Sequence, residues 1–337
     1  MTTIRLIAGL FWLLIVIPAA AQQPEFKGGI ELVSVPVTVT SNDHNTYIEG
    51  LTAADFRVTE NGERQTVTTV TRERRPVSVC FVIDSSGSMS LGDRRDLASQ
   101  AVDRIVGQLK PDDEVSIVFF DEKIEERLPW TKVGPGVKLN WGGWTPRGST
   151  ALNDGMRLGF RLIEAAGNAR RVIVLVTDGF ENASRESTAN LVKSRQQSET
   201  TIIGIGVGSP RLEDLQSDVR HVQTHMPPAN AENLRKFEAS APGASESSRP
   251  AAVLPNFDYL ETLVGDSGGS VRRLLSQPEV AMAAKNIVDE LQYEYVIGYT
   301  PTKPLDGKYR KLKVDVNRRG TFVRHRGGYL ALPSKPQ

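Results

Sequence analysis

The chain has 337 residues, of which 39% are hydrophobic and 24% are charged, an ordinary globular composition that allows one large domain and a smaller one. Its 41 basic and 40 acidic side chains leave a net charge of +1. This balance argues against a protein that binds nucleic acid, or an anionic membrane, through its overall charge.

The first residues have the anatomy of a secretory signal. Arg5 precedes an apolar run over residues 6–17, and Pro18 ends that run just before the alanines at 19–21. We expect residues 1–21 to be a signal peptide that is cleaved; retention as an anchor is the alternative. Because the run is shorter than the roughly 20 residues that span a bilayer, we expect an exported protein, periplasmic or extracellular, with no stable membrane insertion after cleavage.

The one cysteine of the sequence, Cys80, lies within an apolar run at residues 77–84. An exported chain with a single cysteine has no internal disulfide, so its stability must come from its core. No charged residue stands next to Cys80 in the sequence to activate the thiol. We therefore expect a small buried side chain and not a nucleophile.

Residues 22–75 are expected to form an N-terminal β segment. Valines alternate with other residues over 33–39, which is the period of a strand with one buried face. A short strand is expected at 56–60, and the hairpin signal Asn61-Gly62 follows it, with a return strand over 67–70. A run of charged residues at the end of this segment indicates a boundary.

From residue 76 the pattern changes to alternating strands and helices. It predicts a doubly wound, mostly parallel sheet with helices on both faces over residues 76–292. A stretch at 209–255, rich in proline, alanine and serine, is interpreted as a partly disordered insertion. Residues 293–337 return to a β pattern. We expect the two terminal β segments to pack together as a small β subdomain, since the ends of an inserted domain usually lie close in space.

The individual elements expected in the alternating part follow from apolar periodicity. The strands are expected at 77–84, 115–120, 172–177 and 201–208, with an edge strand at 123–128. The helices are expected at 93–109, 150–166, 185–200, 257–264 and 278–292.

Oxygen-bearing side chains follow two of these buried strands. Asp84, Ser86 and Ser88 follow the first, Asp178 follows the most apolar one, and Thr150 opens a helix. The first stretch alone also fits a capped strand end with a serine-rich turn. However, the carboxyl ends of neighbouring strands meet at the switch point of a doubly wound sheet. Such a set suits Mg²⁺, with Mn²⁺ or Ca²⁺ as alternatives, and leaves one coordination position for a carboxylate of another molecule.

These residues resemble the metal-ion-dependent adhesion site of von Willebrand factor A domains. Asp84-Ser85-Ser86-Gly87-Ser88 matches the D-x-S-x-S motif of that family, Thr150 its threonine and Asp178 its second aspartate. The resemblance covers roughly residues 76–292. It implies a Rossmann-like α/β fold with a complete adhesion site, and a protein partner that presents an Asp or Glu carboxylate to the bound cation.

The flanking segments resemble those of bacterial secreted proteins related to von Willebrand factor A. On the N-terminal side the similar stretches are residues 35–39, 50–56 and 60–62. On the C-terminal side they are residues 295–299 and 326–329. This second resemblance adds context, but it implies little about function.

Other candidates are weaker. Trp141 and Trp144 lie in the loop before Thr150, where they are expected either to flank the metal and grip a partner or to pack the loop onto the body. Asp121 is a candidate for a group just behind the ligands. His221 and His225 are four residues apart, a spacing that suits two metal ligands on one helix face, but they lack a third ligand nearby.

The sequence therefore favours a secreted or periplasmic protein-binding module, for adhesion or as a scaffold, and not an enzyme. One alternative is a structural protein of the cell envelope whose metal site serves stability alone. Another is a metal-assisted hydrolase, although the four histidines are scattered and no general base stands out.

Overall fold

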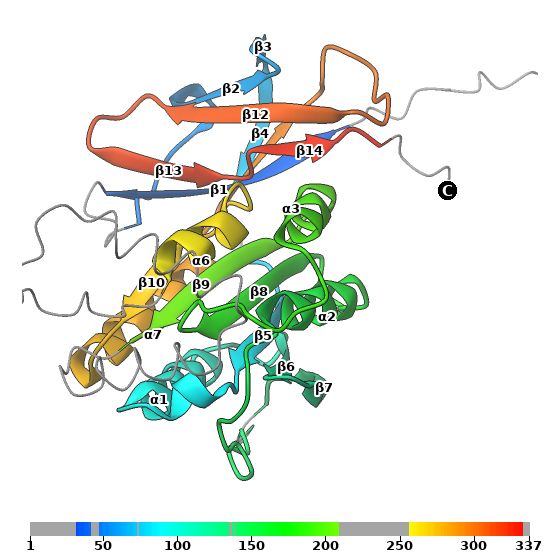
Figure 1. The fold of residues 1–337 in the computed structure, drawn as a ribbon. Helices are drawn as coiled ribbons and strands as arrows, with labels where there is room; N and C mark the ends of the chain where they lie inside the picture. The colour runs from blue at the N-terminus through cyan, green and yellow to red at the C-terminus, as the bar shows by residue number, and fades with distance from the viewer. Residues whose placement is uncertain are drawn as a thin grey trace, which may run out of the picture. The chain divides into compact units, whose positions relative to one another are not determined.

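A six-stranded sheet organises the part of the chain that the computed structural model describes, which is residues 32–41, 47–72, 74–134, 137, 139–208 and 256–332 (Figure 1). The strand order is β10-β9-β8-β5-β6-β7, and every neighbouring pair is parallel except β6 and β7. The strands are β5 (Val77–Asp84), β6 (Glu114–Phe120), β7 (Ile124–Lys132), β8 (Arg170–Thr177), β9 (Thr201–Val207) and β10 (Val271–Leu274).

Helices pack on both faces of this sheet. Buried residues of α1 (Arg94–Val106) and α7 (Gln277–Gln292) belong to the core on one face. Those of α2 (Leu152–Glu164), α3 (Thr188–Gln197) and α6 (Phe257–Val264) belong to the core on the other face. The doubly wound α/β fold predicted from the sequence is therefore confirmed.

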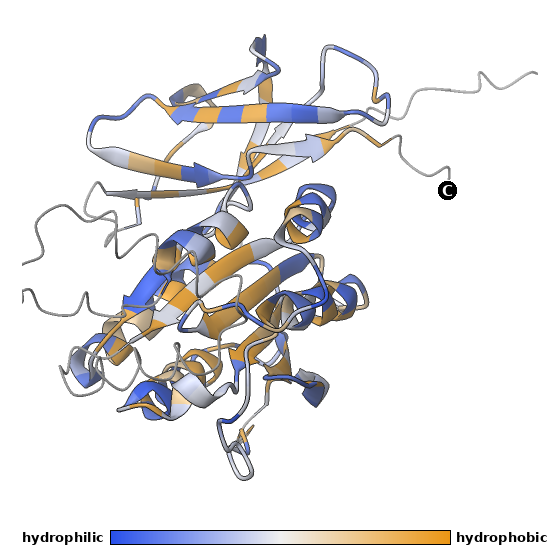
Figure 2. Ribbon diagram, in the orientation of Figure 1, coloured by the Kyte–Doolittle hydropathy of each residue, from blue (hydrophilic) through white to orange (hydrophobic). Residues whose placement is uncertain are grey.

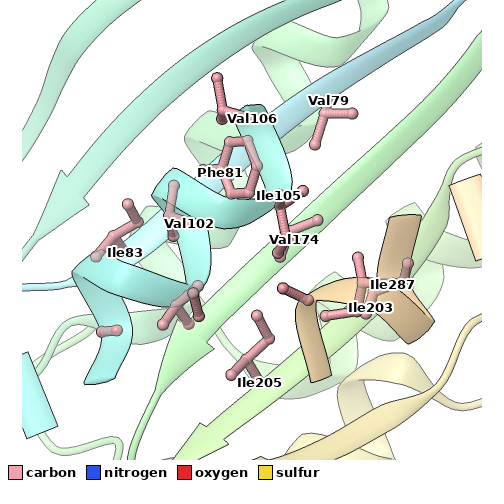
Figure 3. Packing of buried hydrophobic residues seen from close by; sticks show 14 of the residues in the cluster. Val79, Phe81, Ile83, Val102, Ile105, Val106, Val174, Ile203, Ile205 and Ile287 are labelled. Carbon is pink, nitrogen blue, oxygen red and sulfur yellow. The ribbon is translucent and has the colours of Figure 1, made fainter. Parts of the chain in front are cut away.

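Strand β5 is buried along its whole length because its side chains point alternately into the two cores. Phe81 lies among Val102 and Ile105 of α1 (Figure 3). Cys80 and Val82 belong to the core on the opposite face. Figure 2 shows the central strands as largely hydrophobic, whereas the helices carry both hydrophobic and hydrophilic residues. The apolar β-branched run of the sequence thus becomes the strand at the centre of the fold.

Cys80 is expected to resist thiol reagents in the folded protein. Its side chain is fully buried, Ser116 Oγ donates a hydrogen bond to Sγ at 3.3 Å, and burial raises the pKa of the thiol to about 12. The reaction with a chromogenic disulfide should be roughly 100-fold slower in native buffer than in denaturing urea, because the thiolate is the reactive form. Equal rates in the two solutions would contradict the buried position.

Two four-stranded antiparallel sheets complete the described structure. The first has the order β13-β1-β11-β4 and the second the order β14-β12-β2-β3. Each sheet combines strands from both ends of the chain, so the prediction that the terminal segments pack together is confirmed. The N-terminal strands are β1 (Val33–Ser41), β2 (Phe56–Glu60), β3 (Glu63–Gln65) and β4 (Val67–Thr71), and the C-terminal strands are β11 (Tyr295–Tyr299), β12 (Tyr309–Val316), β13 (Thr321–His325) and β14 (Gly328–Leu330).

Two of the expected β elements change sheets in ways that the sequence did not indicate. Asn61 and Gly62 have φ values of 48° and 85° and form the predicted tight turn. The return strand is the short β3, however, and β4 pairs with β11 in the other sheet. The last part of the predicted C-terminal β segment is likewise divided into β13 and β14, which join different sheets. Local alternation marks a half-buried strand but not the sheet that receives it.

A buried carboxylate links strands from both ends of the chain. Glu60 Oε2 accepts hydrogen bonds of 2.7 Å from the hydroxyls of Tyr299 and Tyr329. Glu60 Oε1 accepts a charge-assisted hydrogen bond of 2.8 Å from Arg310. All four side chains are buried. The bonds therefore satisfy a charge that would otherwise destabilise the core.

Several predicted features lie outside the described residues. These are the signal segment at 1–21, the insertion at 209–255, and His221 and His225. The domain boundaries stay predictions. Within the described ranges, no helix combines the length and the apolar character needed to cross a membrane.

Candidate metal centre

Three loops carry the candidate ligands: the first is residues 84–88, the second residues 147–151 and the third residues 177–179. The candidate ligands from the first and third loops lie at the ends of neighbouring strands. β5 pairs in parallel with β8, with Ile83 opposite Val176, so Asp84 and Thr177 end at the same edge. The chain leaves β5 toward β6 on one side and later returns to β8 on the other side, which makes this edge a switch point. Thr177 Oγ1 donates a hydrogen bond of 2.5 Å to Asp84 Oδ2.

The first loop folds back toward the strand end. Asp84 Oδ1 accepts a hydrogen bond of 2.8 Å from the backbone N–H of Ser86. The hydroxyl oxygens of Ser86 and Ser88 lie 3.1 Å apart, and both side chains are buried. A short 3-10 helix (Gly87–Ser90) carries the second of them. The alternate hydroxyl residues of the sequence are thus placed side by side, close to the carboxylate.

The second loop is bonded to the first through the backbone. The N–H of Gly87 donates to the carbonyl of Gly148 at 3.0 Å, and the N–H of Arg147 donates to the carbonyl of Ser85 at 2.9 Å. Thr150 is 3% exposed, and its own N–H donates to Asn182 Oδ1 at 2.8 Å. The first two bonds hold the first and second loops together, and the third joins Thr150 to the segment that follows the third loop.

The third loop carries Asp178, which is fully buried. Its Oδ1 lies 3.4 Å from the N–H of Phe180, and its carbonyl accepts a hydrogen bond of 2.8 Å from Asn256, the N-cap of α6. The following residue, Gly179, has φ of 83°, and a Cβ there would lie 2.7 Å from the Asn256 carbonyl oxygen. Only glycine allows this close approach without strain.

The two buried carboxylates create a strongly negative environment. Burial raises the pKa of Asp84, and the charge of Asp178 raises it further. Hydrogen bonds from Ser86 and Thr177 act in the opposite direction, because they favour the charged form. Two acids buried this close to each other are stabilised by positive charge.

Arg94 supplies part of that charge, and sequence reasoning missed it. It is the first residue of α1 and is fully buried. Its Nη1 donates to Asp178 Oδ2 at 3.0 Å and to the carbonyl oxygen of Ser88 at 3.2 Å. A signal was present in the sequence, because Leu97 and Ala98 follow Arg94 at helical spacing and mark the side of α1 that faces the sheet.

The donor set fits a hard divalent cation. It consists of oxygen atoms alone, from two carboxylates and three hydroxyls, which is the ligand chemistry that Mg²⁺, Mn²⁺ and Ca²⁺ share. Within the described ranges, no group of three or more His, Cys, Asp or Glu side chains is arranged to hold a metal ion. Hydroxyl groups would therefore have to complete any shell built on Asp84 and Asp178.

The structure places the two tryptophans against the body of the domain. Trp144 is 2% exposed, and its ring centroid lies 5.3 Å from that of Phe119 and 5.2 Å from that of Trp141. Trp141 is only partly buried and donates from Nε1 to the carboxylate oxygens of Asp103 at 3.0 and 3.1 Å. This position favours the packing interpretation for Trp144, which offers no free surface to a partner, whereas Trp141 retains some.

Asp121 has a local role at the end of β6. Its Oδ1 accepts a hydrogen bond of 2.6 Å from the N–H of Lys123, and its carbonyl oxygen accepts one of 2.9 Å from the N–H of Ala151. The carbonyl bond attaches the start of α2 to the edge of the sheet. Asp121 thus contributes to the position of Thr150 through its backbone.

Comparison with solved structures found several low-identity matches. An aerotolerance-related membrane protein from Bacteroides fragilis is 19% identical, with a TM-score of 0.41, over 64% of this chain and 98% of that one. BatB from Bacteroides thetaiotaomicron is 17% identical, with a TM-score of 0.40, over 64% and 97%. A von Willebrand factor type A protein from Catenulispora acidiphila is 12% identical, with a TM-score of 0.42, over 90% and 75%.

A comparison with curated proteins found no match. The comparison with protein families was more informative. Residues 79–181, however, match the family model of the von Willebrand factor type A domain. This range includes Asp84, Thr150 and Asp178 together with the strands and the helix that position them. The part of the chain that carries the candidate metal centre is therefore similar to a von Willebrand factor type A domain.

Proposed function

We propose that this protein is an exported binding module, for adhesion or as a scaffold, that engages a protein partner through a divalent cation. The cation is of the Mg²⁺ type and is held by oxygen atoms of Asp84, Ser86, Ser88, Thr150 and Asp178. When bound, it supplies a Lewis-acidic position for a carboxylate oxygen of an Asp or Glu on the partner. We place it in the periplasm or outside the cell, because the sequence predicts a signal peptide.

The observation that carries this proposal is the pair of buried acids at the switch point. Asp84 and Asp178 are both fully buried, and their mutual repulsion is relieved by added positive charge. The family match supports a binding role, because von Willebrand factor type A domains typically bind proteins and are usually not catalytic. No observation among the described residues favours a hydrolase: His325, the one histidine described, is bonded to the backbone of Val314 in β12 and of Arg326, which follows β13.

Asp84→Asn is expected to weaken binding of Mn²⁺ at least 100-fold, because the amide keeps the shape of the side chain but removes the charge that holds the cation. Titration calorimetry with Mn²⁺ alone measures this directly. Asp121→Asn is the matched control, since Asp121 also follows a strand of the same sheet but is outside the proposed ligand set. Equal affinities in the wild type and Asp84→Asn would contradict the proposed site.

Partner capture tests the binding role separately. Affinity capture from the native cell envelope is expected to retain a partner with Mg²⁺ present, and to lose it with EDTA or with Asp84→Ala. Retention that is indifferent to both would reject the proposed function. A metal that raises the melting temperature while Asp84→Ala keeps every partner would favour the purely structural alternative.

A further inference from the structure

Helix α2 begins without a capping side chain of its own. Its N-cap residue is Ala151, whose methyl side chain cannot accept a hydrogen bond. The N–H groups in the first turn of a helix have no partner within the helix, and a polar side chain at the N-cap normally accepts hydrogen bonds from them. Thr150, whose hydroxyl is a proposed ligand of the cation, comes directly before this position.

The segment that follows the third loop, residues 180–187, supplies the missing acceptors. Glu181 Oε2 accepts a hydrogen bond of 2.8 Å from the N–H of Asn153, and Ser184 Oγ accepts one of 3.1 Å from the N–H of Asp154. These are the second and third N–H groups of α2, which an N-cap side chain would otherwise bind. The negative charge of Glu181 also suits the start of a helix. Glu181 therefore caps α2 from another part of the chain.

The same carboxylate fixes the segment to which it belongs. Glu181 Oε1 accepts hydrogen bonds from the N–H groups of Ala183 and Ser184 at 3.1 and 2.9 Å, and Oε2 accepts one of 2.7 Å from the Ser184 hydroxyl. Asp154 of α2 binds the segment in return, because its carboxylate accepts hydrogen bonds of 3.1 Å from two further backbone N–H groups there. The start of α2 and the segment after the third loop thus hold each other.

We propose that Glu181 is a positioning residue of the candidate metal centre. Its carboxylate joins the start of α2 to the segment after the third loop, and so keeps the hydroxyl of Thr150 at the cation that Asp178 also binds. The inference rests on the proposed function, because it assumes that Thr150 and Asp178 are ligands of one cation. It adds a residue that acts on the cation only through a ligand.

The bonds around Glu181 explain how it acts on Thr150. The next residue, Asn182, accepts a hydrogen bond of 2.8 Å from the N–H of Thr150 and donates its own N–H to the Thr150 carbonyl at 3.0 Å. Thr150 is therefore held between Asn182 on one side and the capped turn of α2 on the other. Because Glu181 follows Asp178 by three residues, its bond to Asn153 ties the two proposed ligands together. Groups that orient metal ligands in this way commonly affect metal affinity.

A double-mutant cycle with Thr150 separates positioning from capping that serves stability alone. Titration calorimetry gives the Mn²⁺ affinity of the wild type, Thr150→Val, Glu181→Gln, Glu181→Asp and the two double variants. Thr150→Val keeps the shape of the side chain and removes the hydroxyl. Glu181→Gln keeps the length but turns an amide N–H₂ toward N–H donors, whereas Glu181→Asp keeps the charge and shortens the side chain by one methylene.

Glu186→Gln is the matched control. It removes the same charge from the same segment, but the Glu186 carboxylate accepts its hydrogen bonds from Ser187 and Asn190 at the start of α3. It makes no hydrogen bond with residues 150–154, all of which the structure describes. A loss of Mn²⁺ affinity that came only from the lost negative charge would therefore appear in Glu186→Gln as well.

Thr150→Val and Glu181→Gln are each expected to weaken Mn²⁺ binding about tenfold. Glu181→Asp should weaken it in the same direction but by less, and Glu186→Gln should stay within about twofold of the wild type. In the Thr150→Val background, either change at Glu181 should weaken binding no more than Glu186→Gln does, because no hydroxyl is left to position.

The outcomes separate the two proposals. A wild type that does not bind Mn²⁺ overturns the proposed function, and this inference with it. If Mn²⁺ binds and Thr150→Val weakens it, then unchanged affinity in Glu181→Gln, or losses that add in full in the double variants, overturn the inference alone. Unchanged affinity in Thr150→Val also overturns it, because Thr150 would not be a ligand.

Folding of the Glu181 variants is checked by circular dichroism before calorimetry. If only Glu181→Asp folds, its cycle with Thr150→Val decides in the same way. If neither variant folds, the carboxylate serves the fold as a whole, and a specific role in positioning Thr150 is overturned.

Discussion

Replacing Glu60 with alanine is expected to lower the free energy of unfolding by about 3–5 kcal/mol. The carboxylate is 4% exposed and accepts hydrogen bonds from two tyrosine hydroxyls and one guanidinium. Its removal leaves Arg310 with a buried charge and takes the acceptor from the hydroxyls of Tyr299 and Tyr329. Urea unfolding followed by circular dichroism measures the loss.

Glu63→Ala is the matched control for this prediction. Glu63 lies three residues later on the next strand, but it is exposed and pairs at 2.9 Å with Lys303, which is also exposed. Its removal should leave the midpoint of urea unfolding unchanged, since exposed ion pairs contribute little. If Glu60→Ala and Glu63→Ala shifted the midpoint equally, burial of the Glu60 network would not be what stabilises these sheets.

The Glu60 network also gives a physical meaning to the motifs in the flanks. Glu60, Tyr299 and Tyr329 each belong to a different stretch that resembles the bacterial secreted proteins. In the structure they meet at one carboxylate. A fourth residue of these stretches, Tyr295, accepts a hydrogen bond of 3.1 Å from the N–H of Leu51. These residues of the flanking motifs therefore help to assemble the two ends of the chain.

The α/β part could be predicted from the sequence because its signal is local and strong. A strand buried on both faces, such as β5, needs an uninterrupted apolar run, and a helix on the sheet needs apolar residues at helical spacing. In the two antiparallel sheets, the contacts that determine which sheet a strand joins are made with residues distant in sequence. β4 pairs with β11, more than 200 residues away, and nothing within β4 itself indicates that partner.

The candidate site was predictable to a similar degree. Motif spacing and the switch-point rule together predicted that Asp84 and Asp178 follow neighbouring strands, and the pairing of β5 with β8 confirms that adjacency. That the five residues bind a cation stays a prediction. Arg94 was missed because a charged residue at a helix start is usually at the surface. Its contact with Asp178 depends on how α1 packs against the sheet, and that packing is visible only in the structure.

Replacing Trp144 with alanine is expected to lower the free energy of unfolding by about 3–5 kcal/mol, the usual cost of deleting a buried aromatic side chain and leaving a cavity. The indole is 2% exposed and packs on Phe119 of β6 and on Trp141. Its Nε1 has no hydrogen-bond partner among the described residues. Trp144→Phe should therefore cost less, about 1–2 kcal/mol, since it keeps the ring contacts and removes an unsatisfied donor.

Trp144→Ala should also weaken Mn²⁺ binding about tenfold in protein that remains folded, although Trp144 is not a proposed ligand. The loop that it anchors continues to Arg147 and Gly148, whose backbone bonds hold the second loop against the first. Without this anchor the loop would be more mobile, and the Thr150 hydroxyl would be held less well beside the other proposed oxygen ligands. A tryptophan that served only as a partner contact would leave both stability and Mn²⁺ affinity unchanged. Urea unfolding and calorimetry on Trp144→Ala therefore show whether Trp144 anchors the loop or contacts a partner. Trp141→Ala, at a partly exposed position, is measured for comparison.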